Sequence, residues 1–377
     1  MSDAIPDLDS LQQRIIELEQ RCQDLETILE ITAEHADSIE IELEKRNELL
    51  QSIFGRYVTK EVVEQLLSSP EALRFGGERR QLTILCSDLR GFTALAERLP
   101  AEDIIRILTY YLGSMAGVIM ARGGTVNLFL GDGILVYFGA PVPSHDHARR
   151  ALGCALAMQA AMPEVNRTLM QWGYPALEMG IGLNTGEAVV GNVGSEQRAQ
   201  YGAIGAAVNL AFRIESYTTG GGILASAATL SCAGAGVQVA DEMTVFPKGS
   251  RGPLTIYPIC GLDEEPALQL VRDTSRLSEL ASPLPVRIAE LHEKEISLDS
   301  LAGWLRQVGP RAAVLGFDLP DHALPALFTN LRLELPGSVE AYAKVKRLMP
   351  EQRLFYVSLT QVSPEFERAL HKLIHGS

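Results

Sequence analysis

The chain has 377 residues, more than one ordinary domain needs, so two or three folded units are expected. Hydrophobic residues make up 46% and charged residues 21%, which allows a buried core and excludes a chain that is disordered throughout. The net charge of −14 comes without a basic stripe, which argues against a nucleic-acid polymer as partner. An acidic protein can still bind small anions if metal ions and a few local cations supply positive charge.

The cysteine pattern and the N-terminus indicate where the protein resides. The five cysteines are scattered and form no CxxC pair, so neither a disulfide framework nor a zinc site is expected. The first residues lack the basic and apolar stretches of a signal peptide. No apolar run reaches the roughly 20 residues of a membrane helix, because 131–133 interrupts the longest candidate, 128–142. We expect a cytoplasmic protein with no membrane span.

Residues 1–50 carry a heptad pattern typical of a coiled coil. One seam position holds Leu8, Ile15, Cys22, Leu29, Ala36, Leu43 and Leu50, and the other holds Leu11, Leu18, Leu25, Thr32 and Ile39 until Arg46 breaks it. The pattern predicts a dimerisation helix, which Thr32 and Ala36 weaken in its middle. The alternative is a single amphipathic helix lying on the protein's own core.

Residues 51–78 are expected to form a connector that ends in a turn at Gly76 and Gly77. Strands and helices then alternate through residues 79–262, which predicts an α/β or α+β sandwich with helices packed on a sheet. In chain order we expect a strand over 82–88, a helix from Pro100 to Gly123, two strands around a turn at 131–133, a helix over 145–162, a strand–turn–strand over 178–194, and a helix over 206–217.

Two aspartates are candidates for metal binding. Asp88 ends a buried strand, and Asp132 lies in a Gly-Asp-Gly turn between two apolar strands. If these strands are neighbours, both carboxylates emerge at one edge of the sheet and form the oxygen-rich site that Mg²⁺ prefers. Gly91 would let backbone N–H groups approach a phosphate closely. Strand-end and turn aspartates are also common without any metal.

Asn209, Arg213 and Lys248 are the other chemically notable side chains. Asn209 and Arg213 lie four residues apart on a predicted helix, so they share a face that is otherwise apolar. Lys248 lies in the loop PKGSRG between two strands. Each also has an ordinary interpretation, as a helix-surface hydrogen bond or an exposed loop lysine.

Together, these segments resemble the class III nucleotidyl cyclase family over residues 51–262. The segments LTILCSDLRGFTALAE and NLFLGDGILVYFG resemble the two metal motifs of that family. GLNTGEAVVGNVG, YGAIGAAVNLAFRIES and FPKGSRGPLTIYPI resemble its later strands, its transition-state helix and its closing strand, and FGRYVTKEVVEQLL resembles the connector of bacterial members. The resemblance implies an α+β, ferredoxin-like cyclase sandwich that closes a nucleoside triphosphate into its 3′,5′-cyclic monophosphate.

The resemblance also implies roles for the metal half of the site. Asp88 and Asp132, with the Leu89 carbonyl, would hold two Mg²⁺ or Mn²⁺ ions that activate the ribose 3′-hydroxyl and clamp the α-phosphate. The backbone amides of Phe92 and Thr93 would cradle the terminal phosphates.

The remaining roles would fall to the other half of the site. Arg213 would neutralise charge on the α-phosphate, Asn209 would orient the ribose, and Lys248 would bind the triphosphate. In this family the two halves come from opposite subunits, so a homodimer with two equivalent sites is implied.

Base selectivity in its usual form is missing. Family adenylate cyclases usually carry Lys, and guanylate cyclases Glu, where this chain has Leu128. The second base-reading position is Gly202. Neither side chain offers a donor or an acceptor. ATP is favoured only because adenylate cyclases are commoner in the family, and GTP is the alternative. A catalytically silent homologue with a sensing or scaffolding role is a further alternative, against which the full set of functional side chains argues.

Residues 263–377 change in composition and are predicted to form a small β-barrel with a closing helix. This part resembles a degenerate PilZ domain, the bacterial receptor fold for cyclic di-GMP. Arg272 and Arg276 match its RxxxR motif, while Glu295 and Ser297 stand in its altered second motif. A shifted register over 300–303 is also open, and the alternative is a structural or partner-binding barrel.

Overall fold

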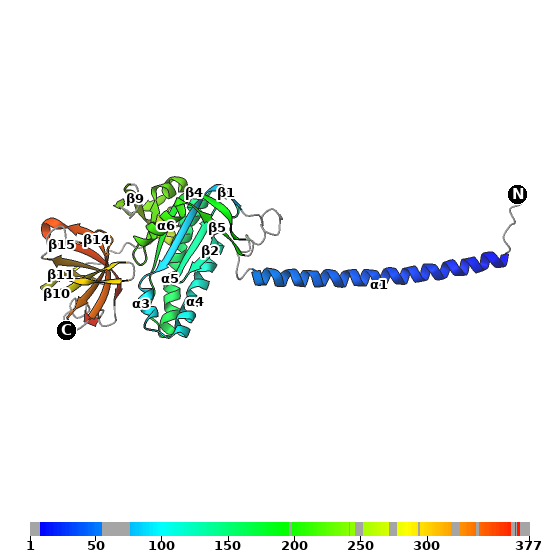
Figure 1. The fold of residues 1–377 in the computed structure, drawn as a ribbon, viewed down its shortest axis with the longest axis horizontal. Helices are drawn as coiled ribbons and strands as arrows, with labels where there is room; N and C mark the ends of the chain where they lie inside the picture. Colours follow the sequence, from blue (N-terminus) through cyan, green and yellow to red (C-terminus); the bar gives the residue numbers. More distant parts are fainter. Residues whose placement is uncertain are drawn as a thin grey trace. The chain divides into compact units, whose positions relative to one another are not determined.

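The computed structural model describes residues 8–54, 76–195, 198–240, 242–245, 252–270, 277–292, 295–317, 325–336, 339–362, 366 and 368–369. These residues belong to two compact units, Met1–Ser69 and Pro70–Ser377. The first unit is built around one helix. The second contains a sheet covered by helices and a closed barrel (Figure 1).

The N-terminal unit contains α1 (Leu8–Phe54), a helix of 47 residues. Its described side chains, 12–46, are exposed along the whole length, including the seam residues Leu18 at 51%, Leu25 at 58% and Leu29 at 68%. The predicted helix is therefore present, and the described part of its apolar seam is exposed.

The central sheet contains nine strands among the described residues. Its elements are β1 (Gly76–Leu89), α3 (Phe92–Ala96), α4 (Ala101–Ala121), β2 (Thr125–Leu130), β3 (Gly133–Phe138), α5 (His147–Gln171), β4 (Met179–Ser195), β5 (Arg198–Ile204), α6 (Ala206–Ser216), β6 (Ile223–Ser226), α7 (Ala227–Ala233), β7 (Val237–Val239), β8 (Met243–Val245) and β9 (Leu254–Leu262). The strand order is β2-β3-β1-β4-β6-β9-β7, with β5 paired to β4 and β8 paired to β9.

Helices cover both faces of this sheet. Because successive strand residues point to opposite faces, β1 contributes Leu85 to one core and Leu82 and Ile84 to the other. The first core lies under α4 and α5. The second lies under α6, which contributes Ala207, Val208 and Ala211. The expected α+β sandwich is confirmed.

Two local expectations are wrong. The strand–turn–strand over 178–194 is one continuous strand, β4, of 17 residues. The expected turn at Gly76 and Gly77 is instead the start of β1, paired with Asn192 and Gly191 of β4. In both segments glycine permits close backbone approach rather than a turn: a Cβ on Gly191 would lie 2.1 Å from the Gly76 carbonyl oxygen.

Helix α4 is the one described helix that is long and apolar enough to cross a membrane by length and composition alone. It starts after Pro100 and ends before Gly123, as the sequence predicts. Its apolar side chains Ile107, Tyr111, Met115 and Ile119 are 0% exposed in the first core. Core packing therefore accounts for this buried apolar stripe of the helix.

The C-terminal part is the predicted barrel. Its strands are β10 (Ser278–His292), β11 (Glu295–Val308), β12 (Ala312–Phe317), β13 (Asn330–Leu335), β14 (Val339–Met349) and β15 (Leu354–Val362), closed in the order β10-β11-β12-β15-β14-β13. Short helix η4 (Pro350–Gln352) lies between β14 and β15, whereas η2 (Pro266–Leu268) precedes the barrel and packs on the cyclase core through Leu268. The expected closing helix lies mostly outside the described residues.

The four candidate cyclic di-GMP residues are only partly covered by the structure. Arg272 and Arg276 lie outside the described residues. Glu295 and Ser297 lie at the start of β11, where the backbone is described and the side chains are not.

Candidate active site

The two candidate metal aspartates meet at one edge of the sheet. β1 and β3 pair antiparallel with Ser87 opposite Ile134, which places Asp88 beside the turn that holds Asp132. The backbone N–H of Leu89 donates to Asp132 Oδ2 at 3.3 Å. A Cβ on Gly133 would lie 3.4 Å from Asp88 Oδ1, so glycine keeps this turn close to the carboxylate.

Electrostatics disfavour the ionised form of Asp88. Partial burial, followed by the charges of Asp132 and Glu215, raises the pKa of Asp88 to about 7. Arg90 opposes this effect, because its Nη1 lies 3.9 Å from Asp88 Oδ2. An edge with several nearby carboxylates would be stabilised by a cation.

The donor set fits a divalent cation that is shared with a ligand. Asp88 and Asp132 supply carboxylate oxygens, the donors that Mg²⁺ prefers. Among the described residues, no group of three or more His, Cys, Asp and Glu side chains could hold a metal by itself. Water and the phosphate oxygens of a substrate would complete the coordination, as is usual for Mg²⁺ held by one or two carboxylates.

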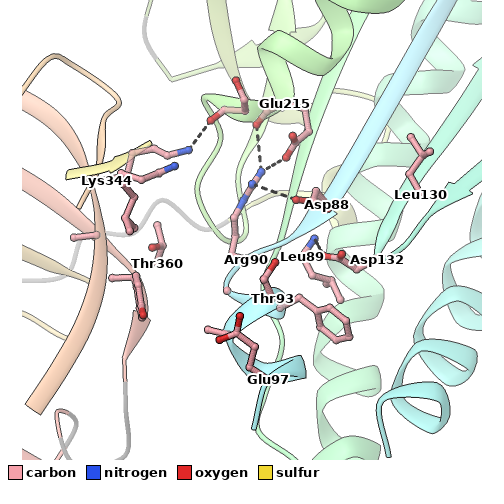
Figure 2. A pocket seen from close by; sticks show the side chains of 18 residues that line it. Asp88, Leu89, Arg90, Thr93, Glu97, Leu130, Asp132, Glu215, Lys344 and Thr360 are labelled. Carbon is pink, nitrogen blue, oxygen red and sulfur yellow. Dashed lines mark hydrogen bonds and ion pairs between the residues drawn. The ribbon is translucent and has the colours of Figure 1, made fainter. Parts of the chain in front are cut away.

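A pocket of about 660 Å³ opens beside these aspartates (Figure 2). The turn that follows β1 lines it with Gly91, Phe92 and Thr93. Gly91 has φ 69° and directly precedes α3, a backbone conformation that favours glycine. Phe92 is buried in the core and Thr93 is exposed, so the core fixes the turn while its polar side faces the pocket.

Asn209 and Arg213 belong to a different surface. Both are exposed on α6, and neither is among the described residues that line the Asp88 pocket. The last turn of α6 reaches that pocket through Glu215 and Ser216 instead. Lys248 lies outside the described residues.

The two base-reading positions lie on neighbouring segments. Leu128 of β2 is 37% exposed, and a Cβ on Gly202 of β5 would meet no atom within 4 Å. The adjacent Asn127 donates from Nδ2 to the Tyr201 carbonyl at 2.7 Å, which ties β2 to β5. The structure thus joins the two segments that hold these positions, and Leu128 and Gly202 are each open to solvent or free space.

His147 is better explained by folding than by metal binding. It is 5% exposed, and its Nδ1 lies 2.8 Å from Thr83 Oγ1. Its side chain therefore turns into the interior at the start of α5, where Asp146 is the N-cap residue and makes no side-chain cap hydrogen bond.

Comparison with known proteins identifies the domain. The family model for the adenylate and guanylate cyclase catalytic domain matches residues 77–261. The crystal structure of the guanylyl cyclase Cya2 is 52% identical in sequence, covers 52% of this chain and 100% of its own, and has a TM-score of 0.51. The chain belongs to the class III adenylate and guanylate cyclase family. Its catalytic domain is that of a phosphorus–oxygen lyase.

Two curated relatives of this cyclase domain are adenylate cyclases of greater length. Adenylate cyclase 1 of Rhizobium meliloti (strain 1021) is 33% identical over 214 residues, which are 55% of this chain and 32% of that protein. The adenylate cyclase of Anabaena cylindrica is 30% identical over 212 residues, which are 55% of this chain and 41% of that protein. The chain thus spans less than half the length of these relatives.

Sequence reasoning missed three charged residues beside the cyclase pocket. Arg90, one residue past β1, pairs with Glu215 of α6, and Lys344 of β14 reaches the end of α6 (Figure 2). Burial raises the pKa of Glu215, and burial followed by Arg90 lowers the pKa of Lys344 to about 7. In the sequence Lys344 alternates with apolar residues as an ordinary outward-facing strand residue does, so no local signal marks it.

Proposed function

We propose that this protein converts a purine nucleoside triphosphate into its 3′,5′-cyclic monophosphate and pyrophosphate, as a cytoplasmic signalling enzyme. The observation that carries the proposal is the pair Asp88 and Asp132, set beside the Gly91–Thr93 turn in a cyclase domain. Two Mg²⁺ or Mn²⁺ ions held there would activate the ribose 3′-hydroxyl and neutralise the α-phosphate.

The protein's own groups would position the reacting atoms. The Phe92 and Thr93 backbone amides would hold the terminal phosphates, so that pyrophosphate leaves in line with the attacking 3′-oxygen. Asn209 would orient the ribose, and Arg213 would neutralise the charge that grows on the α-phosphate. Lys248 would bind the triphosphate.

The reaction would require a homodimer. Asn209 and Arg213 are exposed and away from the lining of the Asp88 pocket, which supports their use at the site of a second protomer. The exposed seam of α1 supports a parallel coiled coil that brings two protomers together.

Mixing two inactive variants tests this arrangement. Asp88→Asn and Arg213→Ala should each lower turnover by at least about 10²-fold. Co-refolded together, half of the dimers would be mixed and carry one intact site, so activity should recover to about a quarter of wild type. If the mixture stays as inactive as its parts, each protomer holds its own complete site.

Two bases are candidates for the substrate. ATP is supported by the adenylate cyclases at 33% and 30% identity. GTP is supported by the guanylyl cyclase at 52% identity across its full solved chain. The higher identity favours GTP, and the apolar Leu128 suits a pocket that separates the two bases weakly.

The deciding experiment is direct. Purified full chain is incubated with ATP or GTP and Mn²⁺ or Mg²⁺, and the product is identified by mass. A cyclic monophosphate that disappears in Asp132→Asn supports the proposal. Absence of any cyclic product with either nucleotide and either ion would favour the silent homologue.

The barrel would be a PilZ-like receptor for cyclic di-GMP. The closed six-stranded barrel supports this reading, together with the RxxxR motif of Arg272 and Arg276. Calorimetry of the full chain with cyclic di-GMP should show heat that disappears in Arg272→Ala/Arg276→Ala. No heat at high micromolar ligand would leave the barrel a structural or docking module.

A further inference from the structure

Strand β14 of the barrel is anchored to helix α6 of the cyclase domain through Lys344. This lysine is 2% exposed, and its Nζ donates to the carbonyl oxygens of Ser216 at 2.5 Å and Thr218 at 2.9 Å. The carbonyls at a helix C-terminus carry partial negative charge, so a cation is favoured there. Lys344 lies on the outer side of β14, because its neighbours Ala343 and Val345 belong to the barrel core.

Two further contacts surround this anchor. Tyr217, between the two acceptor carbonyls, packs edge-to-face on Phe328 of the barrel with ring centroids 5.2 Å apart. Phe328 has φ 65°, an uncommon conformation for a bulky residue, which the surrounding packing must hold. Arg311 of the barrel also pairs with Glu178 of the cyclase domain at 3.1 Å.

The same end of α6 is also held by Arg90, which lies beside the candidate metal ligand Asp88. Arg90 donates to the Glu215 carboxylate, to Thr218 Oγ1, and to the Glu215 carbonyl at 3.2 Å. Its other guanidinium nitrogen lies 3.9 Å from Asp88. Arg90 and Lys344 therefore hold adjacent atoms of one helix end, with Asp88 on one side and the barrel on the other (Figure 2).

The barrel also forms part of the pocket wall. Asn330, Tyr342 and Thr360 line the pocket together with Thr93 and Asp132 of the cyclase domain. Asn330 is directly opposite Lys344 in the β13–β14 ladder, so the anchor fixes the position of this wall. The pocket keeps about 660 Å³ of space, which leaves room for a polyphosphate chain between the two parts.

We propose that the barrel is the outer wall of the triphosphate pocket and that Lys344 holds this wall in place. The ligand class is the polyphosphate end of a nucleoside triphosphate, so this inference rests on the proposed function. Lys344 is a positioning residue, because it acts through α6 and the wall rather than on the substrate.

Full-length Lys344→Met tests the proposal, since methionine keeps the apolar stem and removes the donor. Losing the two hydrogen bonds of the Lys344 amine should weaken the wall, raising KM for ATP or GTP about tenfold and changing kcat less than about threefold. Calorimetry with inorganic tripolyphosphate and Mg²⁺ should show the same loss of affinity. Arg347→Met, which removes an exposed charge from the same strand, is the matched control and should behave as wild type.

A second variant keeps the test decisive if Lys344→Met folds poorly. Asn330 is exposed, so Asn330→Asp should leave the melting temperature unchanged. Its new negative charge should weaken tripolyphosphate binding by roughly twofold to fivefold.

The outcomes separate this inference from the proposed function. Wild-type KM and wild-type tripolyphosphate affinity in both Lys344→Met and Asn330→Asp would overturn it, even if cyclic nucleotide is made. Higher activity in Lys344→Met would also overturn it, because the barrel would then obstruct the pocket. Tripolyphosphate binding that depends on Lys344 supports the wall even if wild type makes no cyclic product.

Discussion

At the level of single residues, Asp88 carries the clearest chemical signature. Its carboxyl group lies against Asp132 and Glu215, and its pKa is raised to about 7. The folded protein therefore binds a proton at Asp88 that the unfolded chain releases near its ordinary pKa of 3.8. Because a divalent cation needs the ionised carboxylate, this proton competes with the metal.

Two pH dependences follow for Asp88. The apparent affinity for Mg²⁺ should rise as pH rises from about 6 to 8, as the proton leaves. In metal-free protein, Asp88 should lower the free energy of unfolding as pH rises from about 4 to 7, since the folded state then loses its extra proton. Calorimetric Mg²⁺ titrations and thermal melts in EDTA measure both. Asp132→Asn removes the neighbouring charge and should flatten the melting profile, and an unchanged profile would contradict the coupling.

Leu128 should govern the choice of base. Leu128→Lys places a donor on an open surface that now lacks one, so it should shift the ratio of kcat/KM toward ATP by about tenfold or more. Competition between ATP and GTP measures the ratio. Leu128→Met adds no donor and is the control. An equal shift in both variants would place base reading elsewhere.

Sequence reasoning can select residues that carry their chemistry locally. Asp88 at a strand end and Asp132 in its Gly-Asp-Gly turn are candidates on that ground, and the structure brings them to one edge of the sheet. Arg90, Glu215 and Lys344 could not be selected in this way, because their importance depends on three segments far apart in the chain meeting at one helix end. Charged residues on α6 and β14 otherwise resemble ordinary surface positions.

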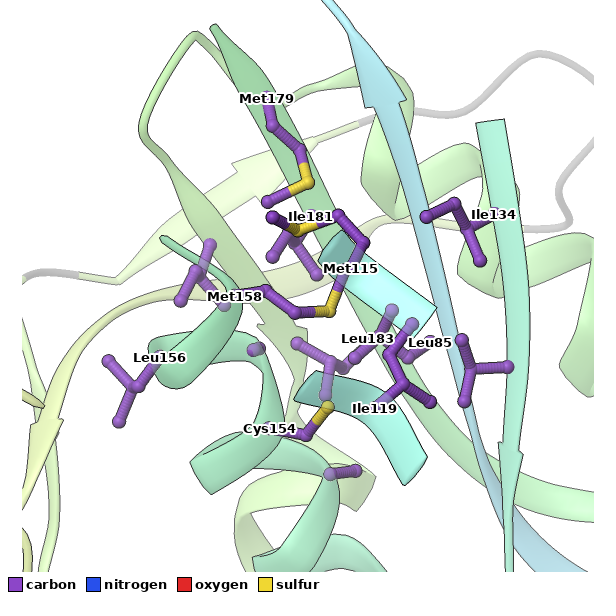
Figure 3. Packing of buried hydrophobic residues seen from close by; sticks show 14 of the residues in the cluster. Leu85, Met115, Ile119, Ile134, Cys154, Leu156, Met158, Met179, Ile181 and Leu183 are labelled. Atoms are coloured by element: carbon purple, nitrogen blue, oxygen red, sulfur yellow. The ribbon is translucent and has the colours of Figure 1, made fainter. Parts of the chain in front are cut away.

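At the level of elements, β4 explains why the sequence predicted a turn within 178–194 where the structure has one strand. Its odd positions Met179, Ile181 and Leu183 pack against α4 and α5, where Figure 3 shows them beside Met115 and Met158. Its even positions include Gly180, Gly182 and Gly186, which face α6 and Arg90. A Cβ on Gly186 would lie 2.9 Å from Ala207 Cβ, so glycine there serves close packing. A single sequence does not distinguish this use from a turn.

Gly182→Ala tests the role of these glycines. Its Cβ would lie 2.3 Å from the backbone N of Glu215, and backbone cannot move aside cheaply. The free energy of unfolding should fall by about 1–3 kcal/mol or more. Gly117→Ala in α4 meets no atom within 4 Å and should instead stabilise by up to about 1 kcal/mol. Urea unfolding of both variants measures the difference, and equal stabilities would refute close packing as the reason for glycine.

At the level of the whole molecule, the heptads predicted a long helix and the structure contains it. Leu18→Glu/Leu25→Glu places charges in the proposed seam and should weaken dimerisation, lowering specific activity on dilution. Ile16→Glu/Ile31→Glu makes the same chemical change at exposed positions outside the seam and should not. Analytical ultracentrifugation with activity at several concentrations measures both effects. If both double variants weaken dimerisation equally, the heptad seam does not mediate it.

The Arg90–Glu215 contact has a kinetic consequence in such a dimer. α6 would carry Asn209 and Arg213 for one site, while Arg90 joins its last turn to Asp88 of the other. A cation at Asp88 would interact with the same charged groups that hold α6. Binding at one site would therefore change the affinity of the second site by a coupling free energy of about 1–3 kcal/mol. Substrate saturation curves should then depart from a Hill coefficient of 1. Arg90→Lys replaces the planar guanidinium with a single ammonium group and should return the Hill coefficient toward 1. A single, largely buried ion pair would make two chemically identical sites cooperative.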